Sequence, residues 1–146
     1  MSLNQEERVA VVTYRLEKAD RAMEQAKHNL PMKYWELIAN RMYYAAYYAV
    51  SALLIANGLS AKTHETILRL FGLHFIQTGL FPKEHGRLYN KLFSLRLKGD
   101  YNDRFDLTSE EVLPLVEPTE QLIKDVSQKA LADLYSENLS NNIFMN

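Results

Sequence analysis

The chain has 146 residues, which is the usual length of one domain. A composition of 47% hydrophobic and 24% charged residues is typical of a globular protein and excludes extensive disorder. The net charge is −1, and the absence of cysteine excludes disulfides, thiolate metal ligands and thiol nucleophiles.

Apolar periodicity predicts five helices and no strand. The first helix, residues 4–29, carries one apolar stripe of residues three or four apart: Val9, Val12, Leu16, Ala19, Met23 and Ala26. Pro31 suits the first turn of a second helix, residues 31–57, which Gly58 ends as a left-handed cap. The second helix is apolar on most of its circumference, so we expect it to be the central and most buried one.

A third helix is predicted for residues 63–78 and a fourth for residues 82–98. Gly79 and Gly99 follow them directly and are expected to end them.

The segment after the fourth helix, residues 100–106, reads as an ordered loop. Tyr101 and Phe105 are the expected apolar anchors of this loop. Arg96 and Asp100 lie four residues apart, which permits a structural ion pair if the helix extends through the glycine between them.

The fifth helix is predicted for residues 108–135. Thr108 and Glu111 have the spacing of a capping box at its start. Pro114 and Pro118 predict that its first turns are irregular.

These elements predict an all-α fold, an antiparallel bundle of about five helices built on a long central hairpin. Residues 1–135 are expected to form one domain. Residues 136–146 are expected to form a flexible tail, because they are mostly polar and terminal.

Charge is distributed unevenly along the chain. Residues 62–98 hold 7 basic and 2 acidic side chains, and residues 99–146 hold 3 basic and 10 acidic ones. The basic segment has the charge to meet phosphates. The simpler interpretation, which we favour on this feature alone, is that it packs against the acidic segment of the same fold.

Polar residues interrupt the most apolar helix at one place. Asn40 and Arg41 precede a run of tyrosines, and helical spacing puts Arg41, Tyr44 and Tyr48 on one stripe with Tyr47 beside it. An arginine with an amide and several phenols suits a phosphate or a nucleobase. Alternatively, Arg41 pairs with an acidic residue of a neighbouring helix and the tyrosines fill the core. The pattern itself leaves both interpretations open.

An ordered set of motifs between residues 31 and 107 resembles the HEPN family (higher eukaryotes and prokaryotes nucleotide-binding), in its small stand-alone prokaryotic branch. The motifs are Asn40-Arg41-x-Tyr43-Tyr44-Ala45, Ala52-Leu53-Leu54, Gly58, Lys62-Thr63-His64, Phe75, Thr78-Gly79, Leu95-Arg96 and Asp100-Tyr101. The resemblance implies a helical bundle, usually a homodimer. Many members of the family are ribonucleases, and they are commonly encoded beside a minimal nucleotidyltransferase as toxin and antitoxin.

The resemblance also implies a catalytic arginine followed after four to six residues by a histidine. The arginine maps onto Arg41, but Ala46, Tyr47 and Tyr48 stand where the histidine belongs. Tyrosine, with an ordinary pKa of about 10, is a far poorer base than histidine. Some toxins of the family carry a tyrosine that the partner transferase modifies with AMP, and Tyr48 is the candidate for that position.

A second polar group follows the second helix. In the functional interpretation, Lys62 and His64 lie near the site, and His64 substitutes for the missing acid or base. In the structural interpretation, which we favour, Thr63 caps the next helix and His64 is exposed on the surface.

The sequence therefore predicts a dimeric HEPN-type protein that binds RNA or a nucleotide and belongs to a toxin–antitoxin or defence pair. The expected binding residues are Asn40, Arg41, Tyr44, Tyr47 and Lys62, and the candidate catalytic residues are Arg41, Tyr48 and His64. One alternative is a non-catalytic interaction module for a nucleotidyltransferase partner. A second is a metal-independent ribonuclease that uses His64 or Tyr48.

No cofactor or metal is expected, because the sequence has neither phosphate-binding glycine motifs nor paired metal ligands. Without a signal peptide or a run of 18 apolar residues, a cytoplasmic protein with no membrane contact is expected.

Overall fold

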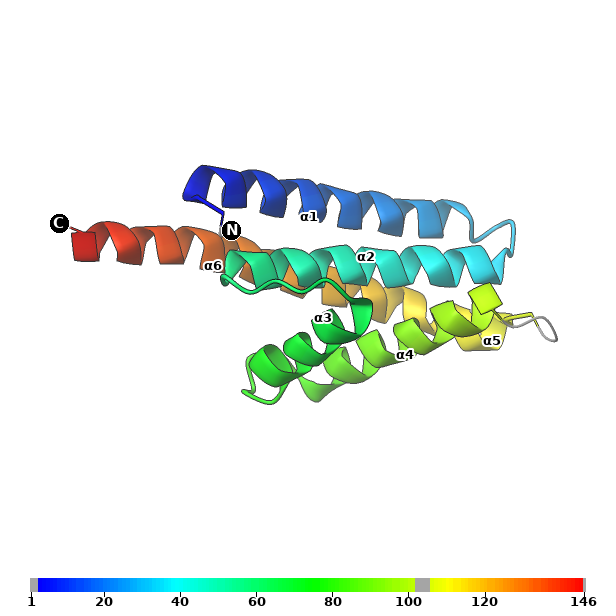
Figure 1. Ribbon diagram of the computed structural model, residues 1–146. Helices are drawn as coiled ribbons and strands as arrows, with labels where there is room; N and C mark the ends of the chain where they lie inside the picture. The colour runs from blue at the N-terminus through cyan, green and yellow to red at the C-terminus, as the bar shows by residue number, and fades with distance from the viewer. Residues whose placement is uncertain (1–2, 102–105, 146) are drawn as a thin grey trace.

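The computed structural model describes residues 3–101 and 106–145, with side chains described through residue 136. In this part of the chain every regular element is helical (Figure 1). The elements are α1 (Gln5–His28), α2 (Trp35–Ala56), α3 (His64–Phe71), the π-helix η1 (Gly72–Ile76), α4 (Lys83–Tyr101), α5 (Ser109–Val112), the 3₁₀ turn η2 (Leu113–Leu115) and α6 (Val116–Met145). The predicted all-α fold is confirmed.

Helix α2 is the centre of the bundle, as its apolar circumference predicts. It forms a long antiparallel hairpin with α1, and it also contacts α3, α4 and α6 (Figure 1). Met42, Tyr43 and Ala52 point in different directions around α2, and all three are wholly buried. The buried residues of α2 include several alanines, whose small side chains let the neighbouring helices approach closely.

The start of the second helix differs from the prediction. Residues 29–33 form successive turns, in which Met32 and Lys33 donate their backbone N–H groups to the carbonyls of Asn29 and Leu30. Lys33 has a φ of 59°, a left-handed conformation that interrupts a helix. Helix α2 therefore begins at Trp35, and Pro31 lies in the turn before it. At the other end Gly58 has a φ of 76°, which confirms it as a left-handed cap.

The fourth helix does not end at Gly99. Helix α4 continues to Tyr101, and within its last turns Arg96 pairs with Asp100 at 3.8 Å, as their spacing predicts. Tyr101 is 72% exposed, so it does not anchor the bundle end. The second expected anchor, Phe105, lies outside the described residues.

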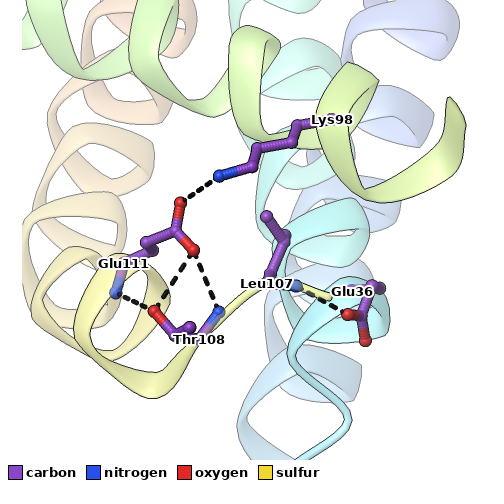
Figure 2. Close-up of polar contacts among 5 residues, drawn as sticks. All are labelled: Glu36, Lys98, Leu107, Thr108 and Glu111. Carbon is purple, nitrogen blue, oxygen red and sulfur yellow. Dashed lines mark hydrogen bonds and ion pairs between the residues drawn. The ribbon is translucent and has the colours of Figure 1, made fainter. Parts of the chain in front are cut away.

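Polar contacts hold the entry to the last helical segment against the rest of the bundle (Figure 2). Thr108 and Glu111 form the predicted capping box. The Lys98 ammonium lies 2.7 Å from Glu111, and its hydrogen bond together with those from Thr108 lowers the pKa of Glu111. The Leu107 N–H donates to Glu36 on α2 at 2.8 Å. These contacts fix α5 to α2 and α4.

The irregular start predicted from the two prolines is also observed, because α5 gives way to the 3₁₀ turn η2 before α6 begins at Val116. The backbone of α6 is helical to Met145, beyond the predicted end at residue 135. Within the described residues, no helix combines the length and apolar character needed to cross a membrane.

We predict that Thr108→Ala lowers the free energy of unfolding by about 1 kcal/mol, because the variant loses the side-chain acceptor of the cap. Thr13→Ala, on an exposed position inside α1, is the matched control and should keep or slightly raise stability, because alanine has the higher helix propensity. Urea unfolding of both variants measures the difference. Equal stabilities for the two variants would contradict the capping role.

Candidate functional site

Arg41 is held in a fixed orientation by neutral partners. Its Nε and Nη2 donate to the Asn40 side-chain oxygen at 3.1 and 2.8 Å, and its Nη1 donates to that of Gln25 at 3.2 Å. The guanidinium carbon also lies 5.3 Å from the centre of the Tyr44 ring. None of these partners is a carboxylate, and no described acidic residue forms an ion pair with Arg41. The interpretation of Arg41 as half of a structural ion pair therefore has no support in the described part of the chain.

The amide of Asn40 links Arg41 to a second arginine. Asn40 accepts from Arg41 through its oxygen and donates through its nitrogen to Asp100 at 3.5 Å. Asp100 in turn pairs with Arg96. The Asp100 carboxylate therefore reaches Arg41 only through the Asn40 amide. The amide orients the Arg41 guanidinium but does not neutralise its charge.

Aromatic side chains surround these groups in one continuous cluster, which we call the ring cluster: Tyr43, Tyr44, Tyr47, Tyr48, His64 and Phe93. Tyr43 is wholly buried, whereas Tyr44, Tyr47 and Tyr48 are partly exposed. The rings of Tyr44 and Tyr48 lie 6.0 Å apart between centroids. The predicted stripe of Arg41, Tyr44 and Tyr48 is therefore contiguous in the structure.

His64 belongs to the ring cluster, so the expectation that it is exposed on the surface is wrong. Thr63 does cap α3 as predicted, accepting the Thr66 N–H at 3.1 Å. However, this cap directs His64 back onto α2, where its Nδ1 shares a hydrogen bond with the Tyr43 hydroxyl. The imidazole also stacks on Tyr47 at a centroid distance of 4.3 Å and an interplanar angle of 7°. Burial, and secondly the charge of Arg96, lower the pKa of His64 from its ordinary 6.5.

Arg96 is the residue of the site that the sequence reasoning missed, because its spacing to Asp100 indicated only a structural pair. Its side chain is 12% exposed, and its guanidinium carbon lies 4.9 Å from the Tyr43 ring and 5.8 Å from the rings of Tyr44 and Phe93. Its buried Nε has no hydrogen-bond partner among the described residues. Burial raises the pKa of Tyr43 while Arg96 opposes that shift. The Arg96 guanidinium thus lies against the faces of these rings and is stabilised largely by cation–π contacts.

Two of the expected site residues, Lys62 and Tyr48, lie at or beyond the edge of the ring cluster. Lys62 is exposed in the link before α3, and no described contact joins it to the ring cluster. Tyr48 faces α1, where the Lys18 ammonium lies 4.8 Å from its ring centre. No described contact joins Tyr48 to His64. No group of three or more His, Asp or Glu side chains among the described residues is placed to hold a metal ion.

Comparison with known proteins agrees with this architecture. A UPF0332 protein of Thermotoga maritima is 34% identical over 128 residues, which cover 88% of this chain and 96% of that protein. A protein of Methanocaldococcus jannaschii named "Putative toxin MJ0605" is 29% identical over 82% of this chain and 87% of its own length. The crystal structure of TT1696 from Thermus thermophilus superposes with a TM-score of 0.68 at 18% identity, covering 81% of this chain and 97% of that one, and supports the fold.

The family model of the HEPN domain matches residues 12–129. That stretch contains most of α1, all of α2, the ring cluster and both arginines of the site. The match covers well over half of the chain, and the resemblance inferred from the sequence motifs is confirmed. The chain belongs to the HEPN domain family.

Proposed function

We propose that this protein binds RNA or a nucleotide, with the Arg41 guanidinium on a phosphate and the exposed tyrosine rings against the bases. The observation that carries the proposal is that the Arg41 guanidinium keeps its charge and some of its N–H donors unpaired. Three of its five N–H donors bond to amide oxygens, and no described carboxylate pairs with it. Two donors and a whole positive charge thus remain for a ligand oxygen.

The surroundings of Arg41 favour a nucleotide over a simple anion. Tyr44 lies beside the guanidinium and Tyr48 beside Tyr44, and both are partly exposed. Bases stack readily on such rings, and each stacked base adds about 1–3 kcal/mol to binding. A phosphate on Arg41 and a base on Tyr44 would be held by neighbouring positions of one helix.

A place in a toxin–antitoxin pair accords with the relatives named as putative toxins. In this proposal the protein is the toxin-like member, forms a homodimer and has a nucleotidyltransferase partner. Modification of Tyr48 by that partner belongs to the same proposal, because the Tyr48 ring lies in a partly exposed position at the edge of the ring cluster.

Fluorescence anisotropy with a labelled single-stranded RNA tests the binding proposal directly. Binding should weaken steeply with added salt, because each phosphate contact releases counterions. If the pure protein binds no RNA or nucleotide at micromolar concentration, the proposal fails. The alternative of a non-catalytic interaction module for a partner protein would then be favoured.

A metal-independent ribonuclease is a second candidate, favoured by the position of His64. The imidazole stacks on Tyr47 and contacts Tyr44 edge-on at 5.9 Å, and Tyr44 in turn lies against Arg41. Burial lowers the pKa of His64 and so favours the neutral imidazole, which is the form that can accept a proton.

For this candidate we predict RNA cleavage in EDTA that falls about 10²–10⁴-fold in His64→Ala, the usual contribution of a general acid or base. His74→Ala, on an exposed histidine of η1, is the control and should cleave like the wild type. A wild type that binds RNA without cutting it would reject the nuclease and retain the binding function.

A further inference from the structure

A groove lies between α1 and α2, beside Tyr48. It has a volume of about 610 Å³ and is lined by Ala10, Val11, Tyr14, Arg15, Lys18, Tyr47 and Tyr48. Two of the lining residues are cations, three are tyrosines and none is acidic. Of the residues of α1, Gln25 contacts Arg41, and it does not line this groove.

The two cations of the groove are not neutralised by described carboxylates. Lys18 lies between two ring faces, 5.3 Å from the centre of Tyr14 and 4.8 Å from that of Tyr48. Arg15 donates from Nη1 to the Ser51 hydroxyl at 2.9 Å, and no ion pair of the described residues includes either cation. The groove therefore presents a net positive charge beside flat aromatic surfaces.

The groove is continuous with the Arg41 site through shared rings. Tyr47 and Tyr48 line the groove and belong to the ring cluster as well. The Tyr48 ring lies 6.0 Å from that of Tyr44, which lies 5.3 Å from the Arg41 guanidinium carbon. A continuous series of contacts thus runs from Arg41 through the rings of Tyr44 and Tyr48 to Lys18, and from Lys18 to the Tyr14 ring.

We propose that this groove, defined by Tyr14, Arg15, Lys18 and Tyr48, holds the nucleotides that adjoin the one at Arg41 in a single RNA strand. Arg15 and Lys18 bind the backbone phosphates, and the rings of Tyr14 and Tyr48 stack against the bases. Proteins bind single strands by this combination of a positively charged groove and aromatic platforms. The inference rests on the proposed function, since it extends the same bound strand beyond Arg41.

The test compares two lengths of RNA. A dinucleotide reaches only the Arg41 site, whereas an oligouridine of about ten nucleotides, within the range that one small domain covers, also reaches the groove. For the wild type we expect tighter binding of the longer strand. Lys18→Ala should remove much of that gain and reduce the slope of log affinity against log salt by about 0.7, the value for one phosphate contact of a single strand. Dinucleotide binding should not change.

Lys91→Ala is the matched charge control, because Lys91 is exposed on α4 and lines a different groove, against η1. For stacking, Tyr14→Ala should weaken the longer strand roughly fivefold to 150-fold, and Tyr14→Phe should retain binding. Tyr135→Ala is the control for Tyr14→Ala, because the two tyrosines are similarly exposed (54% and 56%) and Tyr135 does not line the groove.

The outcomes separate the groove from the Arg41 site. If Lys18→Ala and Lys91→Ala bind the longer strand equally, while Arg41→Ala weakens both lengths, the groove proposal is overturned and the Arg41 site stands. If the wild type binds neither length, both proposals fail. Lys18 and Tyr14 are at least partly exposed, so melting temperatures close to the wild type are expected and confirm that the variants fold.

Discussion

Replacing Arg41 with alanine is expected to weaken RNA or nucleotide binding roughly 10- to 150-fold. A hydrogen bond to a charged group contributes about 1.5–3 kcal/mol, which corresponds to that range. The fold should remain intact, because the partners that Arg41 loses are the neutral amides of Asn40 and Gln25 on a partly exposed surface. Anisotropy titrations and thermal melting of the same preparations measure the two effects.

Gln25→Ala serves as the control for this prediction. It removes the Gln25 oxygen that occupies one Arg41 N–H, but Asn40 still holds Nε and Nη2, so most of the binding should be retained. Had Arg41 been half of a buried ion pair, its removal would cost about 3–5 kcal/mol of stability. A large drop in melting temperature in Arg41→Ala, together with a wild type that binds no RNA, would contradict the ligand role.

Replacing Arg96 with alanine is expected to lower the free energy of unfolding by about 2–4 kcal/mol. The variant loses the cation–π contacts with Tyr43, Tyr44 and Phe93 and leaves a void beneath their rings. Arg96→Met keeps most of the side-chain volume, so its loss of stability should be smaller. Asp100 remains partly exposed in both variants, and water can solvate its carboxylate.

The same pair of variants tests the electrostatic link between Arg96 and His64. Removing the charge of Arg96 should raise the pKa of His64, but in Arg96→Met the pKa should stay below 6.5, since burial is its larger cause. A folded-state pKa below the unfolded one means that the unfolded chain binds the proton more readily. The wild type should therefore lose stability as the pH falls below 6.5, and Arg96→Met should lose less.

An NMR titration of the His64 ring proton measures this pKa in the wild type and in the Arg96→Met variant. A value that is the same in both proteins would contradict the link. Urea unfolding at pH 7 and at pH 5 measures the stability effect. If the wild type and Arg96→Met lose the same stability between these two pH values, that result would also contradict the link between Arg96 and His64.

The sequence predicted the elements whose signals are local. The apolar circumference of residues 31–57 identified the central helix, and the spacing of Arg41, Tyr44 and Tyr48 identified a contiguous face on it. The capping box of Thr108 was equally clear, because each of its contacts lies within four residues.

What the sequence could not show depends on tertiary contacts. Helix α4 continues through Gly99, which is packed so closely that an added Cβ would lie 3.2 Å from Leu107. Glycine serves there for close approach and not as a cap, and the two uses look alike in a sequence. The places of His64 and Arg96 in the ring cluster depend on how α3 and α4 lie against α2, which no spacing within either helix determines.

The interpretation of the basic segment was right only in part. Lys98 does pair with Glu111, and His85 contacts Asp125, both in the acidic segment. Lys83, Arg87 and Lys91 instead line a groove with η1, and none of them forms an ion pair with a described residue of the acidic segment. Net charge over a segment does not reveal on which side of a helix each charge lies.

The most direct test of the central claim is an NMR titration that follows the arginine Nε–H signals while single-stranded RNA is added. If Arg41 is the phosphate ligand, we expect a shift of its signal that saturates with the bound fraction, while the signal of the exposed Arg87 stays unchanged at moderate salt. Saturating binding with no change at Arg41 would contradict the assignment of this residue as the phosphate ligand.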